Sequence, residues 1–304
     1  MTFTRRQLLV TGSLAALGAR FAPRALTAQT PEPPKGVFTD LRSGVGTFSA
    51  SGGTIGWLVA ADAAVVVDSQ MPDTATRFLE GYRGRTARTA DALINTHHHY
   101  DHTGGNGVLR PAVRSIVAHA NVPGLQRRAA EQRKLGPQVV ADTTFTEGWR
   151  LDLGSEAVAA RHYGPAHTGG DIAVHFEKAD VVHLGDLVFN RFYPVIDREG
   201  GARIRGWIAL LEKLVAEYGE STLFICGHGR PEFGVTPRRA DLLLQRDFFV
   251  ALLEHADKGL RAGRSVEEIA TATALAGFPD HVSPMPLLSL ANCLKVACAE
   301  LTEG

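Results

Sequence analysis

The sequence predicts an α/β fold with a helical carboxy-terminal extension, and two observations support this class. Between about residues 44 and 226, short apolar runs of strand length alternate with segments whose apolar residues recur at helical spacing. From about Pro237 the pattern is helical throughout. Alternating strand and helix patterns are typical of sheets covered by helices. A hydrophobic content of 44% is sufficient for a large core in a chain of 304 residues.

The individual elements follow from these patterns. Strands are expected where apolar residues form short runs, near residues 44–49, 54–60, 63–68, 91–96, 115–118, 149–153, 156–161, 172–177, 181–185 and 222–226. Helices are expected where apolar residues recur every three or four positions, as Ile208, Leu211 and Val215 do. The expected helices cover residues 73–87, 120–134, 204–218, 242–260, 266–276 and 287–301.

A histidine-rich segment follows the expected strand at 91–96. Residues 97–102 read HHHYDH, the pattern H-x-H-x-D-H. Side chains two positions apart on an extended backbone point the same way, so His97 and His99 can converge on one ion. The tighter step from Asp101 to His102 requires a turn and can direct that pair at a second ion. Imidazole nitrogens and carboxylate oxygens are ligands that zinc and similar divalent ions accept.

Three further candidate ligands follow in small-residue turns and at strand ends. His167 lies in a turn whose glycines allow the backbone to approach an ion closely. Asp186 and His228 each follow an expected strand, and His228 stands between two glycines. Functional groups concentrate on loops that a rigid scaffold holds in place. Together with H-x-H-x-D-H, these residues predict a metal site.

The order of these residues resembles that of the metallo-β-lactamase-fold superfamily of metallohydrolases, over about residues 44–229. The resemblance implies an αββα sandwich, in which two β-sheets lie between helical layers. It implies three ligands for each of two ions and one residue that bridges them: His97, His99 and His167 for the first ion, Asp101, His102 and His228 for the second, and Asp186 between them. Asp68 matches an early aspartate that steadies the histidine loop by orienting the ligand imidazoles.

The activity implied by the resemblance is metal-dependent hydrolysis of a small molecule. Two zinc ions, or manganese or iron in their place, would lower the pKa of a shared solvent molecule towards neutrality. The resulting hydroxide would attack an acyl carbonyl, with Asp101 orienting the hydroxide or taking its proton. The expected substrate is a β-lactam, lactone, ester or thioester.

A β-lactam is the leading expectation among these substrates, with a lactone or thioester close behind. Residues 164–175 are similar to the corresponding stretch of β-lactamase members. Several of those members have cysteine in place of Asp186 and arginine in place of His102, so these two residues favour the thioesterase (glyoxalase II-like), lactonase and general hydrolase members. Sulfatase and phosphodiesterase activities stay open, because the same metal pair polarises S–O and P–O bonds.

The loop after Asp186 is expected to line the mouth of the pocket and contact the substrate. Asn190 or Tyr193 would donate a hydrogen bond to a developing oxyanion. Arg191 is the nearest cation that could hold a substrate carboxylate. In the alternative interpretation, the aromatic residues of this loop only pack against the sheet.

Two other functional classes stay open. An iron-dependent oxygenase with the same fold would use a single metal, and the intact ligands of the second site argue against it. A non-catalytic, metal-stabilised periplasmic protein would need no hydrolytic pocket, and turnover of an activated ester would distinguish it from an enzyme.

The amino terminus is expected to be an export signal. Residues 4–9, TRRQLL, have a twin-arginine pattern, and the apolar stretch 8–18 is too short to span a membrane. We expect export to the periplasm by the twin-arginine machinery, cleavage near Ala28 and no stable membrane anchor, since no cysteine lies near the cut. The expected organisation is a signal peptide at 1–28, a linker and N-terminal segment at 29–43, a catalytic domain at 44–236 and a helical extension of the same domain at 237–304.

Charge argues against a nucleic-acid partner. The whole chain is neutral, and its first 28 residues carry four arginines and no acidic residue, which leaves a net charge of −4 on the rest. Proteins that bind nucleic acids normally present a basic face. The helical extension either covers the site or forms a homodimer contact, and the sequence leaves both open.

Overall fold

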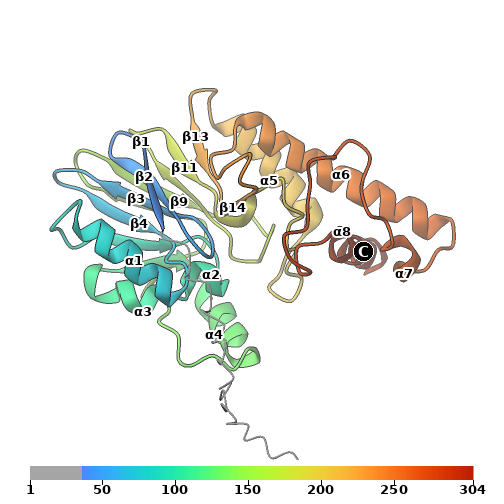
Figure 1. Ribbon diagram of the computed structural model, residues 1–304, viewed down its shortest axis with the longest axis horizontal. Helices are drawn as coiled ribbons and strands as arrows, with labels where there is room; N and C mark the ends of the chain where they lie inside the picture. The colour runs from blue at the N-terminus through green and yellow to red at the C-terminus, as the bar shows by residue number, and fades with distance from the viewer. Residues whose placement is uncertain (1–35, 304) are drawn as a thin grey trace, which may run out of the picture. The chain divides into compact units, whose positions relative to one another are not determined.

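The computed structural model describes residues 36–303, so the expected export signal and its cleavage site lie outside the described residues. The described chain forms one compact unit in which two β-sheets lie between two layers of helices (Figure 1). This is the αββα sandwich expected from the resemblance, with further helices at the carboxy terminus. Within residues 36–303, no helix is long and apolar enough to cross a membrane.

The first sheet has seven strands that follow one another in sequence order. They are β1 (Val37–Arg42), β2 (Val45–Ser49), β3 (Ile55–Val59), β4 (Ala64–Val67), β5 (Ala92–Asn95), β6 (Ile116–His119) and β7 (Thr143–Phe145). Strands β1 to β4 pair antiparallel, and β4 to β7 pair parallel. Parallel pairs need crossover connections, which contain α1 (Pro72–Arg83), α2 (Tyr100–Thr103), α3 (Asn106–Leu109), the 3₁₀ helix η1 (Arg110–Ala112) and α4 (Val122–Gln132).

The second sheet has five strands in the order β13-β11-β10-β9-β8. They are β8 (Gly148–Asp152), β9 (Ala157–Arg161), β10 (Ala173–Phe176), β11 (Val181–His183) and β13 (Leu223–Ile225). The 3₁₀ helix η2 (Gly185–Leu187) and helix α5 (Ile204–Glu217) lie between β11 and β13 in the chain. A separate two-stranded ribbon joins β12 (Phe189–Asn190) to β14 (His228–Gly229).

One core lies between the two sheets, and β4 shows why. Val65 and Val67 face the second sheet, where they join Phe176 of β10, while Ala64 and Val66 face the helices on the other side. Successive side chains of a strand point to opposite faces, so a strand covered on both faces is apolar at every position. Helix α1 packs on the outer face of the first sheet. Helix α5 packs on the outer face of the second sheet, together with α6 (Arg239–Arg261) and α8 (Leu290–Glu303).

The carboxy-terminal helices are α6 (Arg239–Arg261), α7 (Val266–Ile269) and α8 (Leu290–Glu303). The expected helix at 266–276 is wrong beyond Ile269. Its apolar residue Leu275, with Phe278, is buried in the core next to the second sheet, but in a non-helical segment. That segment then reaches Val282, which pairs with Phe192 in an isolated β-bridge. Tertiary packing therefore overrides a helical pattern here.

Candidate metal centre

The histidine-rich segment joins the end of β5 to the first turn of α2. His99 has an extended backbone, with φ −63° and ψ 147°, and α2 begins at the next residue. His97 and His99 therefore project from extended chain, while Asp101 and His102 project from a helical turn. This local change of conformation directs the two pairs into different groups, as the spacing predicts.

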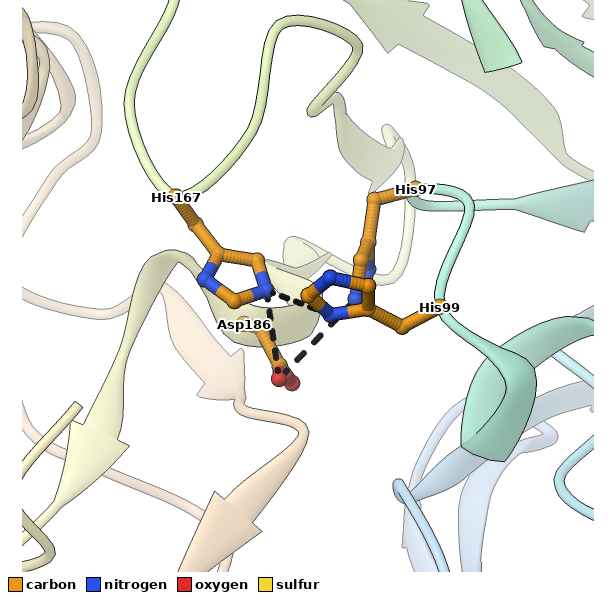
Figure 2. Close-up of side chains that lie close together, drawn as sticks. All are labelled: His97, His99, His167 and Asp186. Atoms are coloured by element: carbon orange, nitrogen blue, oxygen red, sulfur yellow. Dashed lines mark hydrogen bonds and ion pairs between the residues drawn. The ribbon is translucent and has the colours of Figure 1, made fainter. Parts of the chain in front are cut away.

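The first group contains His97, His99, His167 and Asp186, whose ligand atoms lie within 4.8 Å of one another (Figure 2). His167 Nε2 lies 3.0 Å from His99 Nδ1 and 3.6 Å from Asp186 Oδ2. His97 Nε2 lies 3.9 Å from the same carboxylate oxygen. Three elements distant in the sequence thus bring four donor atoms around one point.

The second group contains Asp101, His102 and His228. His228 Nε2 lies 3.1 Å from Asp101 Oδ2 and 3.4 Å from His102 Nε2. Asp186 also contacts this group, because its Oδ1 lies 3.1 Å from His102 Nε2 and its Oδ2 lies 3.5 Å from His228 Nε2. Asp186 therefore stands between the two groups, and the seven residues singled out in the sequence form one cluster.

One buried polar atom in this cluster tests whether the cluster fits a metal. His97 Nε2 is enclosed and has no hydrogen-bond partner among residues 36–303. A buried polar atom without a partner costs free energy, typically about 1–3 kcal/mol. Because an imidazole nitrogen is a metal-ligand type and this one faces the Asp186 carboxylate, a divalent cation between them would satisfy it. The residues present fit a metal ion.

Two histidines of the first group, His97 and His167, are held neutral. Burial, followed by the neighbouring imidazoles, holds the pKa of His97 well below its usual range. Burial lowers the pKa of His167 to about 3, with a further contribution from His99. A neutral imidazole has the lone pair that a metal requires. These two rings are therefore in the state that binds cations.

In the second group, nearby carboxylates favour the protonated form of a histidine instead. Burial opposes protonation of His102, but Asp186, Asp101 and Asp68 outweigh it and raise the pKa well above its usual range. Burial also opposes the charge on Asp186, yet His228 and His102 outweigh it and hold its pKa low. Concentrated negative charge next to histidines is an arrangement that attracts a cation.

The ligand imidazoles are oriented by hydrogen bonds from their other nitrogen. His102 donates its Nδ1–H to Asp68 Oδ2 at 2.8 Å, and Asp68 accepts two further bonds, each 2.7 Å long, from the backbone N–H and the hydroxyl of Thr96. His97 donates its Nδ1–H to the same Thr96 hydroxyl at 3.1 Å. His167 donates its Nδ1–H to the carbonyl of Val195 at 2.8 Å. Asp68 thus joins the ring of His102 to the backbone at the start of the histidine-rich segment.

Asp197 is a residue of the site that sequence analysis misses. His99 donates its Nε2–H to Asp197 Oδ2 at 3.0 Å, and His98 donates its Nε2–H to the same oxygen at 3.3 Å. The backbone N–H of Gly200 donates to Asp197 Oδ1 at 2.8 Å. Because His99 uses its Nε2 to bind Asp197, its Nδ1 faces His167. The sequence does contain a pattern that could have identified Asp197. This acid lies shortly before the glycine pair Gly200-Gly201, just as His167 lies shortly before a glycine pair.

The residues expected at the pocket mouth have other partners. Asn190 donates to the carbonyls of Phe233 and Gly234. Arg191 forms an ion pair with Asp241 at 2.6 Å. Tyr193, 4% exposed, packs against aromatic residues of the carboxy-terminal region. These contacts do not fit the expected substrate role, because all three side chains are buried or engaged within the protein.

A cavity of about 610 Å³ opens beside the first group. His99 and Asp197 line it on the side of the cluster, and α4, the loop 195–200 and Leu287 form the rest of its wall. A cavity of this size is typical of small-molecule sites. The cluster therefore lies next to a space that admits a small substrate.

Comparisons with known proteins agree with this arrangement. The sequence profile of the metallo-beta-lactamase superfamily matches residues 50–228, which include all seven residues of the cluster. A hydroxyacylglutathione hydrolase from Rhodospirillum rubrum is 29% identical over 153 residues, or 49% of this chain and 52% of that protein. A metallo-beta-lactamase type 2 from Bacillus cereus is 26% identical over 169 residues, 54% of this chain and 62% of that protein. The chain thus matches about half the length of the first of these relatives.

Solved structures show the same fold. A metallo-beta-lactamase from Pontibacter korlensis superposes with a TM-score of 0.58 at 17% sequence identity, covering 70% of this chain and 98% of that one. At this level of identity the likeness concerns the fold alone.

Proposed function

Because the chain belongs to the metallo-β-lactamase superfamily of hydrolases, we propose that it is a binuclear zinc-dependent hydrolase of acyl bonds in small molecules. The position of Asp186 between the two groups carries the proposal. Each group alone offers a site for one cation, and a carboxylate shared between them favours a pair of cations.

Each residue has a defined part in this proposal. His97, His99 and His167 would hold the first ion, and Asp101, His102 and His228 the second. When bound, such ions supply Lewis acidity, which polarises a carbonyl and lowers the pKa of water. Asp101 is partly exposed, with 32% of its side chain accessible, and its pKa is low because nearby histidines outweigh its burial. It is therefore a carboxylate that can orient a water molecule or accept its proton.

Two substrates are proposed for this site. A β-lactam is the first, in line with the similarity of residues 164–175 to β-lactamase members and with the B. cereus relative. A thioester is the second, and one observation favours it: His102 is fully buried and aimed at Asp186, so the second group is built from the residues that distinguish this chain from several β-lactamases. Several relatives named hydroxyacylglutathione hydrolase support this second candidate.

Substrate turnover tests both candidates. The full chain, loaded with zinc, is assayed with a chromogenic cephalosporin, an aryl ester and a glutathione thioester of lactate. We expect one class to reach a kcat/KM of about 10⁴ M⁻¹ s⁻¹ or more, the ordinary range for enzymes, and to lose turnover when a chelator removes the metal. A protein that holds two metals per chain and hydrolyses none of the three would contradict the proposal.

We also propose export to the periplasm by the twin-arginine route, on the pattern at residues 4–9. Replacing both Arg5 and Arg6 with lysine keeps the charge of the leader but removes the paired arginines. We expect the unaltered chain in the periplasmic fraction, shortened near Ala28, and the variant in the cytoplasmic fraction at full length. Equal distribution of the two chains would contradict this route.

A further inference from the structure

The cavity beside His99 has walls of two chemical kinds. One wall is aliphatic: Leu125 of α4 and Ile196 are each 8% exposed, and Leu287 lies at the edge with 53% exposure. An exposed leucine at the rim of a cavity is apolar surface that a ligand would remove from water. The segment that carries Leu287 is tied to the fold upstream, where Val282 donates its N–H to the carbonyl of Arg191 at 3.1 Å.

Another part of the wall is cationic. Arg128 and Arg133 both line the cavity from α4 and its carboxy-terminal end, and both are exposed. Among residues 36–303, no carboxylate forms an ion pair with either guanidinium. Arg198, on the loop facing them, is already held by Glu303 of α8.

The charges around these two arginines leave a positive balance. Asp197 points at His98 and His99 and accepts their hydrogen bonds, so it is not available to either arginine. Glu199 is the remaining acid on the cavity wall. Because Asp197 and Arg198 are engaged within the protein, Arg128, Arg133 and Glu199 set the charge of the lining, which is positive beside the first group.

We propose that this cavity binds the non-reacting part of the substrate and selects acyl compounds that carry both an apolar group and an anionic group. The apolar group would lie against Ile196 and Leu287, and the anion, a carboxylate in the simplest case, would pair with Arg128 and Arg133. The reacting carbonyl then lies on the His99 side. This inference rests on the proposed hydrolase function and gives its substrate class. It also assigns recognition of the anion to arginines of α4 and its carboxy-terminal end instead of Arg191, which forms an ion pair with Asp241.

The kinetic test compares two substrates that differ only at the end of the acyl chain: the phenyl thioester of hexanoic acid, which ends in a methyl group, and the mono-phenyl thioester of adipic acid, which ends in a carboxylate. The double variant Arg128→Gln, Arg133→Gln is set against Arg127→Gln, an exposed arginine of the same helix outside the cavity lining. We expect the ratio of kcat/KM for the anionic to the neutral thioester to fall about tenfold in the double variant, mainly through KM, as two partly exposed ion pairs would give. The ratio should stay at the wild-type value in Arg127→Gln, and equal ratios in all three proteins would overturn the proposal.

A binding test keeps this inference separate from the proposed function. Calorimetric titration of the zinc-loaded full chain uses 4-phenylbutyrate and its neutral counterpart 4-phenylbutanol. We expect the double variant to bind phenylbutyrate about tenfold more weakly than the wild type does, with its affinity for phenylbutanol unchanged. Leu287→Ser should lower the affinity for both compounds. This pattern without turnover of any acyl substrate would reject the hydrolase and retain the binding site. Turnover without this pattern would reject the cavity as the site of selection.

Discussion

Asp186→Ala is expected to reduce kcat by about three orders of magnitude while the protein remains folded. The carboxylate of Asp186 lies in contact with both groups, through Oδ1 to His102 and Oδ2 to His167. Charge stabilisation by a metal pair contributes several kcal/mol to the transition state, and each 1.36 kcal/mol is tenfold in rate. Losing the shared carboxylate removes much of that contribution.

The measurement for Asp186→Ala combines kcat on the preferred acyl substrate, metal content per chain and far-UV circular dichroism. Metal content should fall below that of the unaltered chain, because both groups lose a shared ligand. The control is Asp73→Ala, since Asp73 is an exposed acid in the first turn of α1. Turnover like that of the wild type, with two metals per chain, would contradict a bridging role for Asp186.

Most of the strands that could be predicted from the sequence are covered on both faces, although β8, an exposed edge strand of the second sheet, is also among them. β4 and β5 are apolar at almost every position, and such runs stand out. Strands β1 and β7 lie at the edges of the first sheet and are partly exposed, so their patterns are weak. β12 and β14 have two residues each and exist only because they pair with one another across 38 intervening positions. No local pattern specifies such a ribbon.

The candidate site also has a part that could be predicted from the sequence and a part that could not. The seven clustered residues could be identified because each stands in a recognisable local setting: in H-x-H-x-D-H, in a small-residue turn or just after an apolar run. The substrate contacts could not, because a loop sequence does not say which way its side chains turn. Arg191 turns to Asp241, which lies 50 positions later in α6. Asp197 was missed for a similar reason, since its partner His99 is 98 positions earlier.

Asp197→Ala is expected to weaken metal binding at the first group by about 10- to 100-fold, the usual effect of removing a carboxylate that orients a ligand histidine. Without Asp197, nothing among the described residues accepts the Nε2–H of His99, and its ring can rotate or change tautomer. Nδ1 would then no longer be fixed towards His167, from which it now lies 3.0 Å away.

Competition with a chromogenic chelator measures the metal affinity of Asp197→Ala, and rescue by Asp197→Asn separates orientation from charge. The amide oxygen of asparagine still accepts a hydrogen bond, so Asp197→Asn should recover most of the affinity that alanine loses. Glu199→Ala serves as the control, because Glu199 lies in the same loop and no hydrogen bond joins it to a histidine within residues 36–303. If asparagine and alanine weaken the metal equally, the charge of Asp197 and not its hydrogen bond holds the site. If neither weakens it, the orienting role assigned to Asp197 is wrong, and the histidine loop alone fixes His99.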